Sequence, residues 1–109
     1  MKTLKLVLKK KWFDMIASGE KTEEYRETTP YWKKRLCPYY PDDCGATSCV
    51  NCSIMRSNDY DFVTFYLGYR KNRPQKTFRV KYITKGRGKE EWGAKNKNYF
   101  IIKLGERIK

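Results

Sequence analysis

The residues best suited to chemistry gather in one short stretch of the chain. Residues 20–26 contain five charged side chains, and Lys21, Glu24 and Arg26 bring an amine, a carboxylate and a guanidinium together. In a regular strand Glu24 and Arg26 lie on one face, with Lys21 on the opposite face. A carboxylate held beside a guanidinium presents a fixed set of hydrogen-bonding groups to a ligand. The same pattern is also typical of a surface strand whose charges are solvated.

The spacing of these residues resembles that of a known family. Gly19, Lys21, Glu24 and Arg26 match the Gly-x-Lys-x-x-Glu-x-Arg signature of ASCH domains, which belong to the PUA-like superfamily. The resemblance to small bacterial and phage members continues over residues 4–6, 12–16, 86–94 and 99–105. It covers most of the chain except residues 37–60. It implies a small β-barrel with a polar cleft for RNA or nucleotide ligands.

The resemblance also implies an alternative, enzymatic function. Some ASCH proteins are amidohydrolases that act on acetylated cytidine through a lysine, a threonine and a glutamate, and ribonuclease activity is a second precedent. This chain is similar to them at Lys21, but it has Glu24 where they have the threonine, and that departure argues against the same mechanism. If the protein is a hydrolase of a modified nucleoside or of RNA, Lys21 and Glu24 are the candidate catalytic residues, because a buried lysine beside a carboxylate can serve acid–base chemistry.

Composition bounds the class of protein. The chain has 109 residues, which suits one domain with a modest core. Its 25 lysines and arginines against 12 acidic residues give a net charge of +13. Such an excess favours nucleic acid, phosphates or an anionic membrane surface as a partner, or serves solubility alone. No apolar run of about 18 residues and no signal-peptide pattern occurs, so we expect a cytoplasmic protein that does not bind membranes. Histidine is absent, which excludes catalysis by histidine and metal sites that use histidine ligands.

Four cysteines, Cys37, Cys44, Cys49 and Cys52, cluster in an otherwise cysteine-free chain. Because a cytoplasmic protein keeps its thiols reduced, they predict free thiols or a metal site rather than disulfides. The last two have the C-x2-C spacing that suits zinc, whereas the first two are more widely spaced than usual. We expect a structural zinc held by all four thiolates, with reduced thiols or an iron–sulfur cluster as alternatives. Residues 37–60 would then form a cysteine-containing insertion loop tied down by the metal.

Hydrophobic periodicity and turn residues predict an α+β fold, a small barrel of about five strands with two short helices. The expected strands are residues 3–8, 21–27, 61–67, 77–84 and 99–104, and the expected helices are residues 10–17 and 30–36. In the fourth strand, alternation puts Phe78 and Val80 on one face and Ile83 on the other. Residues 85–89 are expected to be a glycine-rich basic loop whose amides can approach phosphates. A single domain covers residues 1–109.

The leading functional hypothesis is a binding module that holds RNA or a nucleotide in a polar cleft. The candidate ligand-binding residues are Gly19, Lys21, Glu24, Arg26, Arg87 and Trp92. Arginine can contact phosphates or bases in a bidentate way, and Glu24 can accept a hydrogen bond from an exocyclic amine. Tyr66, Tyr69 and Trp92 are candidates for stacking on bases, whereas Trp12 is expected only in the core. A third hypothesis is a protein-interaction adaptor that docks its partner through the cysteine loop.

Overall fold

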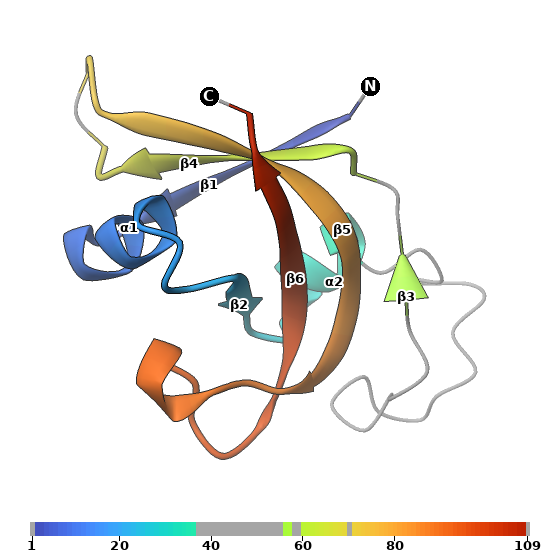
Figure 1. Cartoon of the computed structure of the whole chain (residues 1–109). Helices are drawn as coiled ribbons and strands as arrows, with labels where there is room; N and C mark the ends of the chain where they lie inside the picture. Colours follow the sequence, from blue (N-terminus) through green and yellow to red (C-terminus); the bar gives the residue numbers. More distant parts are fainter. Residues whose placement is uncertain (1, 37–55, 58–59, 70, 109) are drawn as a thin grey trace.

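The described residues form a mixed α+β fold built on one curved sheet. The computed structural model describes residues 2–36, 56–57, 60–69 and 71–108 (Figure 1). In chain order its elements are β1 (Thr3–Leu8), α1 (Lys10–Ala17), β2 (Glu23–Arg26), α2 (Pro30–Leu36), β3 (Arg56–Ser57), β4 (Phe62–Leu67), β5 (Gln75–Arg87), the 3-10 helix η2 (Glu90–Trp92) and β6 (Asn98–Arg107). The strand order is β1-β4-β5-β6-β2, with β3 beside β5. β1 and β4 run parallel, and the other neighbours are antiparallel.

The sheet curls into a half-barrel rather than the closed barrel that the strand count suggested. β1 and β2 are the two ends of the strand order, and within the described residues no backbone pairing joins them. The long strands β5 and β6 curve around the interior, and α1 lies beside the ends of β1 and β4 (Figure 1). The coarse prediction of a small α+β domain with two short helices is confirmed. No helix in the described part of the chain is long and apolar enough to cross a membrane.

Apolar side chains that alternate along the strands fill the inside of this half-barrel. Leu4, Leu6 and Leu8 alternate inward along β1 as predicted, and at most 5 % of each residue is exposed. The remaining buried residues of this core are Phe13, Ile16, Leu36, Val63, Phe65, Phe78, Val80, Ile83, Phe100, Ile102 and Leu104. The apolar face of α1 joins the same core, so hydrophobic burial fixes the helix against the sheet.

β5 departs from the predicted strand in two ways. Its register against β6 shifts between Phe78 and Val80 and again between Val80 and Tyr82, which breaks the strict alternation of faces. As a result Ile83 is 1 % exposed and lies in the same core cluster as Phe78 and Val80, so the prediction of an opposite face was wrong. The strand also continues through residues 85–87, which pair with β6. The predicted basic loop is therefore largely a strand, because its backbone groups belong to the ladder.

Substitution of Ile83 measures the consequence of this irregularity. Ile83→Ala is expected to lower the free energy of unfolding by about 2–5 kcal/mol, because it opens a cavity in the core. Arg79→Ala is the matched control, since strict alternation would place both side chains on the same outer face and Arg79 is exposed. It should change stability by roughly 0.5 kcal/mol or less. Urea unfolding followed by circular dichroism gives both values, and equal small effects would contradict the inward position of Ile83.

Candidate functional site

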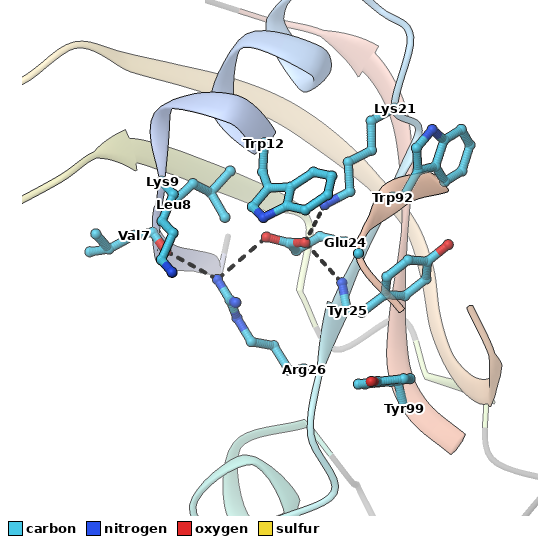
Figure 2. A pocket seen from close by; sticks show the side chains of 11 residues that line it. Val7, Leu8, Lys9, Trp12, Lys21, Glu24, Tyr25, Arg26, Trp92 and Tyr99 are labelled. Atoms are coloured by element: carbon cyan, nitrogen blue, oxygen red, sulfur yellow. Dashed lines mark hydrogen bonds and ion pairs between the residues drawn. The ribbon is translucent and has the colours of Figure 1, made fainter. Parts of the chain in front are cut away.

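A cavity of about 300 Å³ lies between the edge strands β1 and β2, where the half-barrel stays open. Figure 2 shows the end of β1 on one side and β2 on the other, with Trp12 of α1 between them and Trp92 of η2 beside Lys21 and Tyr25. The lining residues are Val7, Leu8, Lys9, Trp12, Lys21, Glu24, Tyr25, Arg26, Trp92, Gly93 and Tyr99. Four predicted ligand residues, Lys21, Glu24, Arg26 and Trp92, are therefore brought together in one place.

Lys21 reaches this cavity because it precedes the regular strand. Its backbone N–H donates to Met15 O of α1 at 3.0 Å, and β2 begins only at Glu23. The alternation expected for a strand from residue 21 therefore does not apply, and the prediction that Lys21 faces away from Glu24 was wrong. The residue is only 2 % exposed, which is unusual for a lysine.

Lys21, Glu24 and Arg26 form a connected set of charges at the centre of the cavity. Lys21 Nζ donates to Glu24 Oε1 at 2.7 Å, and the same oxygen accepts the backbone N–H of Tyr25 at 3.0 Å. Arg26 Nη2 lies 3.5 Å from Glu24 Oε2 and donates to the carbonyl oxygen of Val7 at 3.3 Å (Figure 2). The predicted same-face pairing of Glu24 with Arg26 is thus observed. The guanidinium also connects the two edge strands.

Two polar atoms of this set are buried without a hydrogen-bond partner. They are Glu24 Oε2, an acceptor, and Arg26 Nε, a donor. Buried polar groups are normally satisfied, and leaving one unsatisfied costs about 1–3 kcal/mol. Both atoms belong to residues that line the cavity. A bound polar molecule that offers a donor and an acceptor would satisfy them together.

Aromatic side chains surround the charged set. Lys21 Nζ lies 4.8 Å from the centroid of the Trp12 ring and 5.7 Å from that of Tyr25, which are distances of cation–π contacts. Trp92 and Tyr99 line the cavity from η2 and β6. The sequence assigned Trp12 to the core alone. It does pack against the core, but it is half-buried and also lines the cavity, a double role that a helical period does not reveal.

Two glycines shape the chain around the cavity. Gly19 has a φ of +85° and ends the turn after α1 as predicted, but it does not line the cavity. Gly93 has a φ of +95° and follows η2. A Cβ atom at Gly93 would lie 2.8 Å from the Trp12 ring, so the absence of a side chain lets η2 approach α1.

The other predicted site residues lie apart from the cavity or outside the described chain. Arg87 stands at the end of β5 and donates to Asn96 Oδ1. It is not among the described residues that line the cavity. The four cysteines, Cys37, Cys44, Cys49 and Cys52, lie outside the described residues, so the structural zinc stays a prediction. Among the described residues no group of three acidic or cysteine side chains is arranged to hold a metal ion.

A second polar cluster, centred on Glu23, adjoins the cavity through Tyr25. Glu23 accepts hydrogen bonds from Lys103 and, at 2.7 Å, from the hydroxyl of Tyr25. The Tyr25 oxygen in turn accepts the backbone N–H of Lys89 at 3.1 Å, which connects β2 to the segment before η2. Burial raises the pKa of Glu23, but the hydrogen bonds from Lys103 and Tyr25 outweigh burial and hold its pKa below the ordinary value of 4.5.

A double-mutant cycle tests whether the buried ion pair acts as a unit. Lys21→Met is expected to cost about 3–5 kcal/mol of unfolding free energy, because it leaves the Glu24 carboxylate without its main partner. The double variant Lys21→Met/Glu24→Gln should cost less than the two single changes together, with a coupling of about 1–3 kcal/mol. Glutamine at position 24 can still accept the Tyr25 N–H. Strict additivity in urea unfolding would show that the two side chains do not depend on each other.

The lowered pKa of Glu23 predicts a pH dependence of stability. A carboxyl whose pKa is lower in the folded state adds stability that is complete above its unfolded pKa and is lost as the pH falls through the folded pKa. The stability difference between wild type and Glu23→Gln should therefore be largest at neutral pH and shrink as the pH falls below 4.5 and through the folded pKa of Glu23. Lys103→Met, which removes a donor to Glu23, should show the same trend. Unfolding free energies measured from neutral to acidic pH test this, and a constant difference would contradict the ionic role.

Comparisons with known proteins give no family: no family model, no curated protein and no solved structure matches this chain. The similarity of Gly19, Lys21, Glu24 and Arg26 to the ASCH signature stays a prediction from the sequence.

Proposed function

We propose that this protein binds the base of a nucleotide, free or within RNA, in the cavity between β1 and β2. The observation that carries the proposal is the pair of buried atoms without a hydrogen-bond partner, Glu24 Oε2 and Arg26 Nε, on two side chains that line a cavity with aromatic walls. A nucleobase offers donors and acceptors on its edge and two flat faces. The residues that line the cavity include charged groups that can bond to the edge of a base and aromatic rings that can pack against its faces.

The polar atoms favour a base that carries an exocyclic amine. Glu24 Oε2 can accept from such an amine, as carboxylates do from the N4 amine of cytosine. Arg26 Nε–H can donate to a neighbouring ring nitrogen or carbonyl oxygen of the same base. Because Lys21 and the Tyr25 N–H already occupy Glu24 Oε1, the carboxylate is held in place before a ligand arrives. Such pre-organisation reduces the entropy lost on binding.

Size and charge agree with a single nucleotide. Ligand pockets span about 300–1,000 Å³, so a cavity of about 300 Å³ suits a base with its sugar rather than a larger folded segment. Lys9, Lys21 and Arg26 outnumber the one carboxylate among the lining residues. Lys9 is exposed and can meet a phosphate at the entrance. Trp12 and Trp92 line the cavity with aromatic rings, against which a base can pack.

The resemblance to ASCH domains, which is itself a prediction from the sequence, agrees with this function, because it implies a polar cleft for RNA or nucleotide ligands. Its signature residues Lys21, Glu24 and Arg26 are those that gather in the cavity. A structural zinc bound by the four cysteines would not be catalytic, since a site closed by four thiolates has no open position.

A second candidate function is hydrolysis of a modified nucleoside or of RNA in the same cavity. The observation that favours it is the buried Lys21–Glu24 ion pair at 2.7 Å, because such a pair can exchange a proton with a bound substrate. No serine, threonine or cysteine is among the described residues that line the cavity. The reaction would accordingly use water as the nucleophile, with Glu24 positioned as the base.

Binding of nucleoside monophosphates tests the proposal. Titration calorimetry with the cytidine, adenosine, guanosine and uridine monophosphates should show the tightest binding for an amine-bearing base. Arg26→Gln should weaken it, because a hydrogen bond with a charged group is worth about 1.5–3 kcal/mol, or roughly a 10- to 100-fold change in Kd. Arg79→Gln is the charge-matched control, on an exposed side chain of β5. Equal affinities of the two variants would contradict a role of the cavity.

The same samples separate binding from catalysis. Chromatography of reactions with an acetylated cytidine and with a short RNA would reveal product if the protein is a hydrolase. Product made by the wild type, and not by a folded Lys21→Met/Glu24→Gln variant, would replace the binding function with the hydrolytic one. Binding without product supports a binding module.

A further inference from the structure

The turn between β4 and β5 presents an exposed aromatic ring beside basic side chains. Tyr69 has 86 % of its surface exposed, more than any other large apolar residue in the described part of the chain. Lys71 is exposed two residues later. Arg73 follows, with its guanidinium 4.2 Å from the centroid of the Tyr66 ring. We call Tyr66, Tyr69, Lys71 and Arg73 the hairpin surface.

The hairpin surface is concave and positively charged. Two adjoining hollows of about 460 and 600 Å³ share Tyr69, Lys71 and Arg73 in their walls. Among the described residues, the charged side chains that line the two hollows are Lys10, Lys71 and Arg73, and all three are basic. Lys10 pairs with Asp14 at 2.7 Å. An aromatic ring among cations around a hollow matches the two features of a nucleic acid strand, flat bases and regularly spaced phosphates.

The turn that carries this surface is held in shape by its own hydrogen bonds. Arg73 Nη1 donates to Gly68 O at 2.9 Å, and the Leu67 N–H donates to Pro74 O at 3.0 Å. Asn72 adopts a φ of +60°, the left-handed conformation that asparagine tolerates in tight turns. Arg73 is thereby fixed over Tyr66, so part of the surface is formed before any ligand binds.

The hairpin surface adjoins the cavity described above. The Gly68 N–H donates to Leu8 O at 3.2 Å, which ties the turn to the end of β1. Leu8 and Lys9 line the cavity, whereas the next residue, Lys10, lines one of the hollows. In Figure 1 α1 lies at the same end of β1 and β4 as the turn. A nucleic acid chain that leaves the cavity past Lys9 would therefore reach the hairpin surface next.

We propose that the hairpin surface binds a single-stranded nucleic acid, one nucleotide of which occupies the cavity. Tyr69 stacks on a base outside the cavity, and Lys71 and Arg73 contact phosphates. The inference rests on the proposed function, since it takes the cavity as the site of the first nucleotide. It extends that function by making the partner a strand of several nucleotides rather than a free nucleotide.

Fluorescence anisotropy with labelled oligonucleotides of eight cytidines or eight adenosines, as RNA and as DNA, tests this. Tyr69→Ala should weaken binding of the 8-mer about 5- to 100-fold, the range observed for loss of one base–aromatic stack. It should leave the affinity for the monophosphates unchanged. Tyr69→Phe keeps the stacking face and should bind the 8-mer like wild type. Tyr31→Ala is the matched control, because Tyr31 is an exposed tyrosine on α2.

The salt dependence gives an independent measurement. The logarithm of the binding constant falls linearly with the logarithm of the salt concentration, and each lost phosphate contact with a single-stranded nucleic acid makes this slope shallower by about 0.7. Lys71→Gln should show that decrease for the 8-mer. Lys5→Gln, an equal change of charge on the exposed side of β1 and outside both hollows, should leave the slope near that of wild type.

The outcomes separate this inference from the proposed function. If monophosphates bind but the 8-mer binds no tighter, or if Tyr69→Ala and Tyr31→Ala behave alike, the hairpin surface is overturned and the cavity stands. If Tyr69→Ala weakens the 8-mer although no monophosphate binds to wild type, the hairpin surface is supported and the cavity fails. Loss in Tyr69→Ala of binding to phosphatidylserine vesicles, with 8-mer binding intact, would assign the surface to a membrane and overturn the inference.

Discussion

The site depends on one constraint, which is that the Lys21–Glu24 ion pair is buried in a small protein. Removing two charges from water costs several kcal/mol per ion, and apolar side chains of similar volume are often at least as stable. The carboxylate is compensated by Lys21, the Tyr25 amide and Arg26. This compensation leaves Glu24 Oε2 without a hydrogen bond. A pair kept for stability alone would satisfy that atom, so we infer that the arrangement is kept for a ligand.

The open half-barrel explains why the pair lies where it does. β1 and β2 are edge strands, and the gap between them is crossed by a side chain, Arg26 to Val7 O at 3.3 Å, rather than by a backbone ladder. An edge strand left uncovered exposes unpaired backbone groups. Here Arg26 satisfies one carbonyl of the β1 edge, and residues of α1 and η2 line the same gap, so the fold leaves a cavity with polar walls. The two tryptophans of the lining, Trp12 and Trp92, belong to these two elements.

Local structure was predictable from the sequence wherever local patterns decide it. α1 spans the predicted residues because its apolar period is clear and Gly19 supplies the left-handed residue after it, and α2 begins at Pro30 as expected. Lys21 and Ile83 were misplaced because both depend on long-range pairing: the start of β2 and the register shift of β5 are set by β6. The spacing of the ASCH-like signature predicted that Lys21, Glu24 and Arg26 belong to one site. No pattern in the sequence places Trp12 or Lys9 beside them.

Net charge decides less about function than its size suggests. A protein with a charge of +13 attracts any polyanion. This attraction weakens steeply as the salt concentration rises, because the release of counterions then contributes less to binding. Specific recognition must come from groups whose contribution does not depend on counterions. In the proposed complex, Glu24 Oε2 would accept a hydrogen bond from a base amine, and the uncharged ring of Tyr69 would stack on a base with little dependence on salt. Both groups lie next to cations, Lys21 and Arg26 in the cavity and Lys71 and Arg73 on the hairpin surface. The cations would then supply attraction, while Glu24 and Tyr69 would select nucleic acid from other anions.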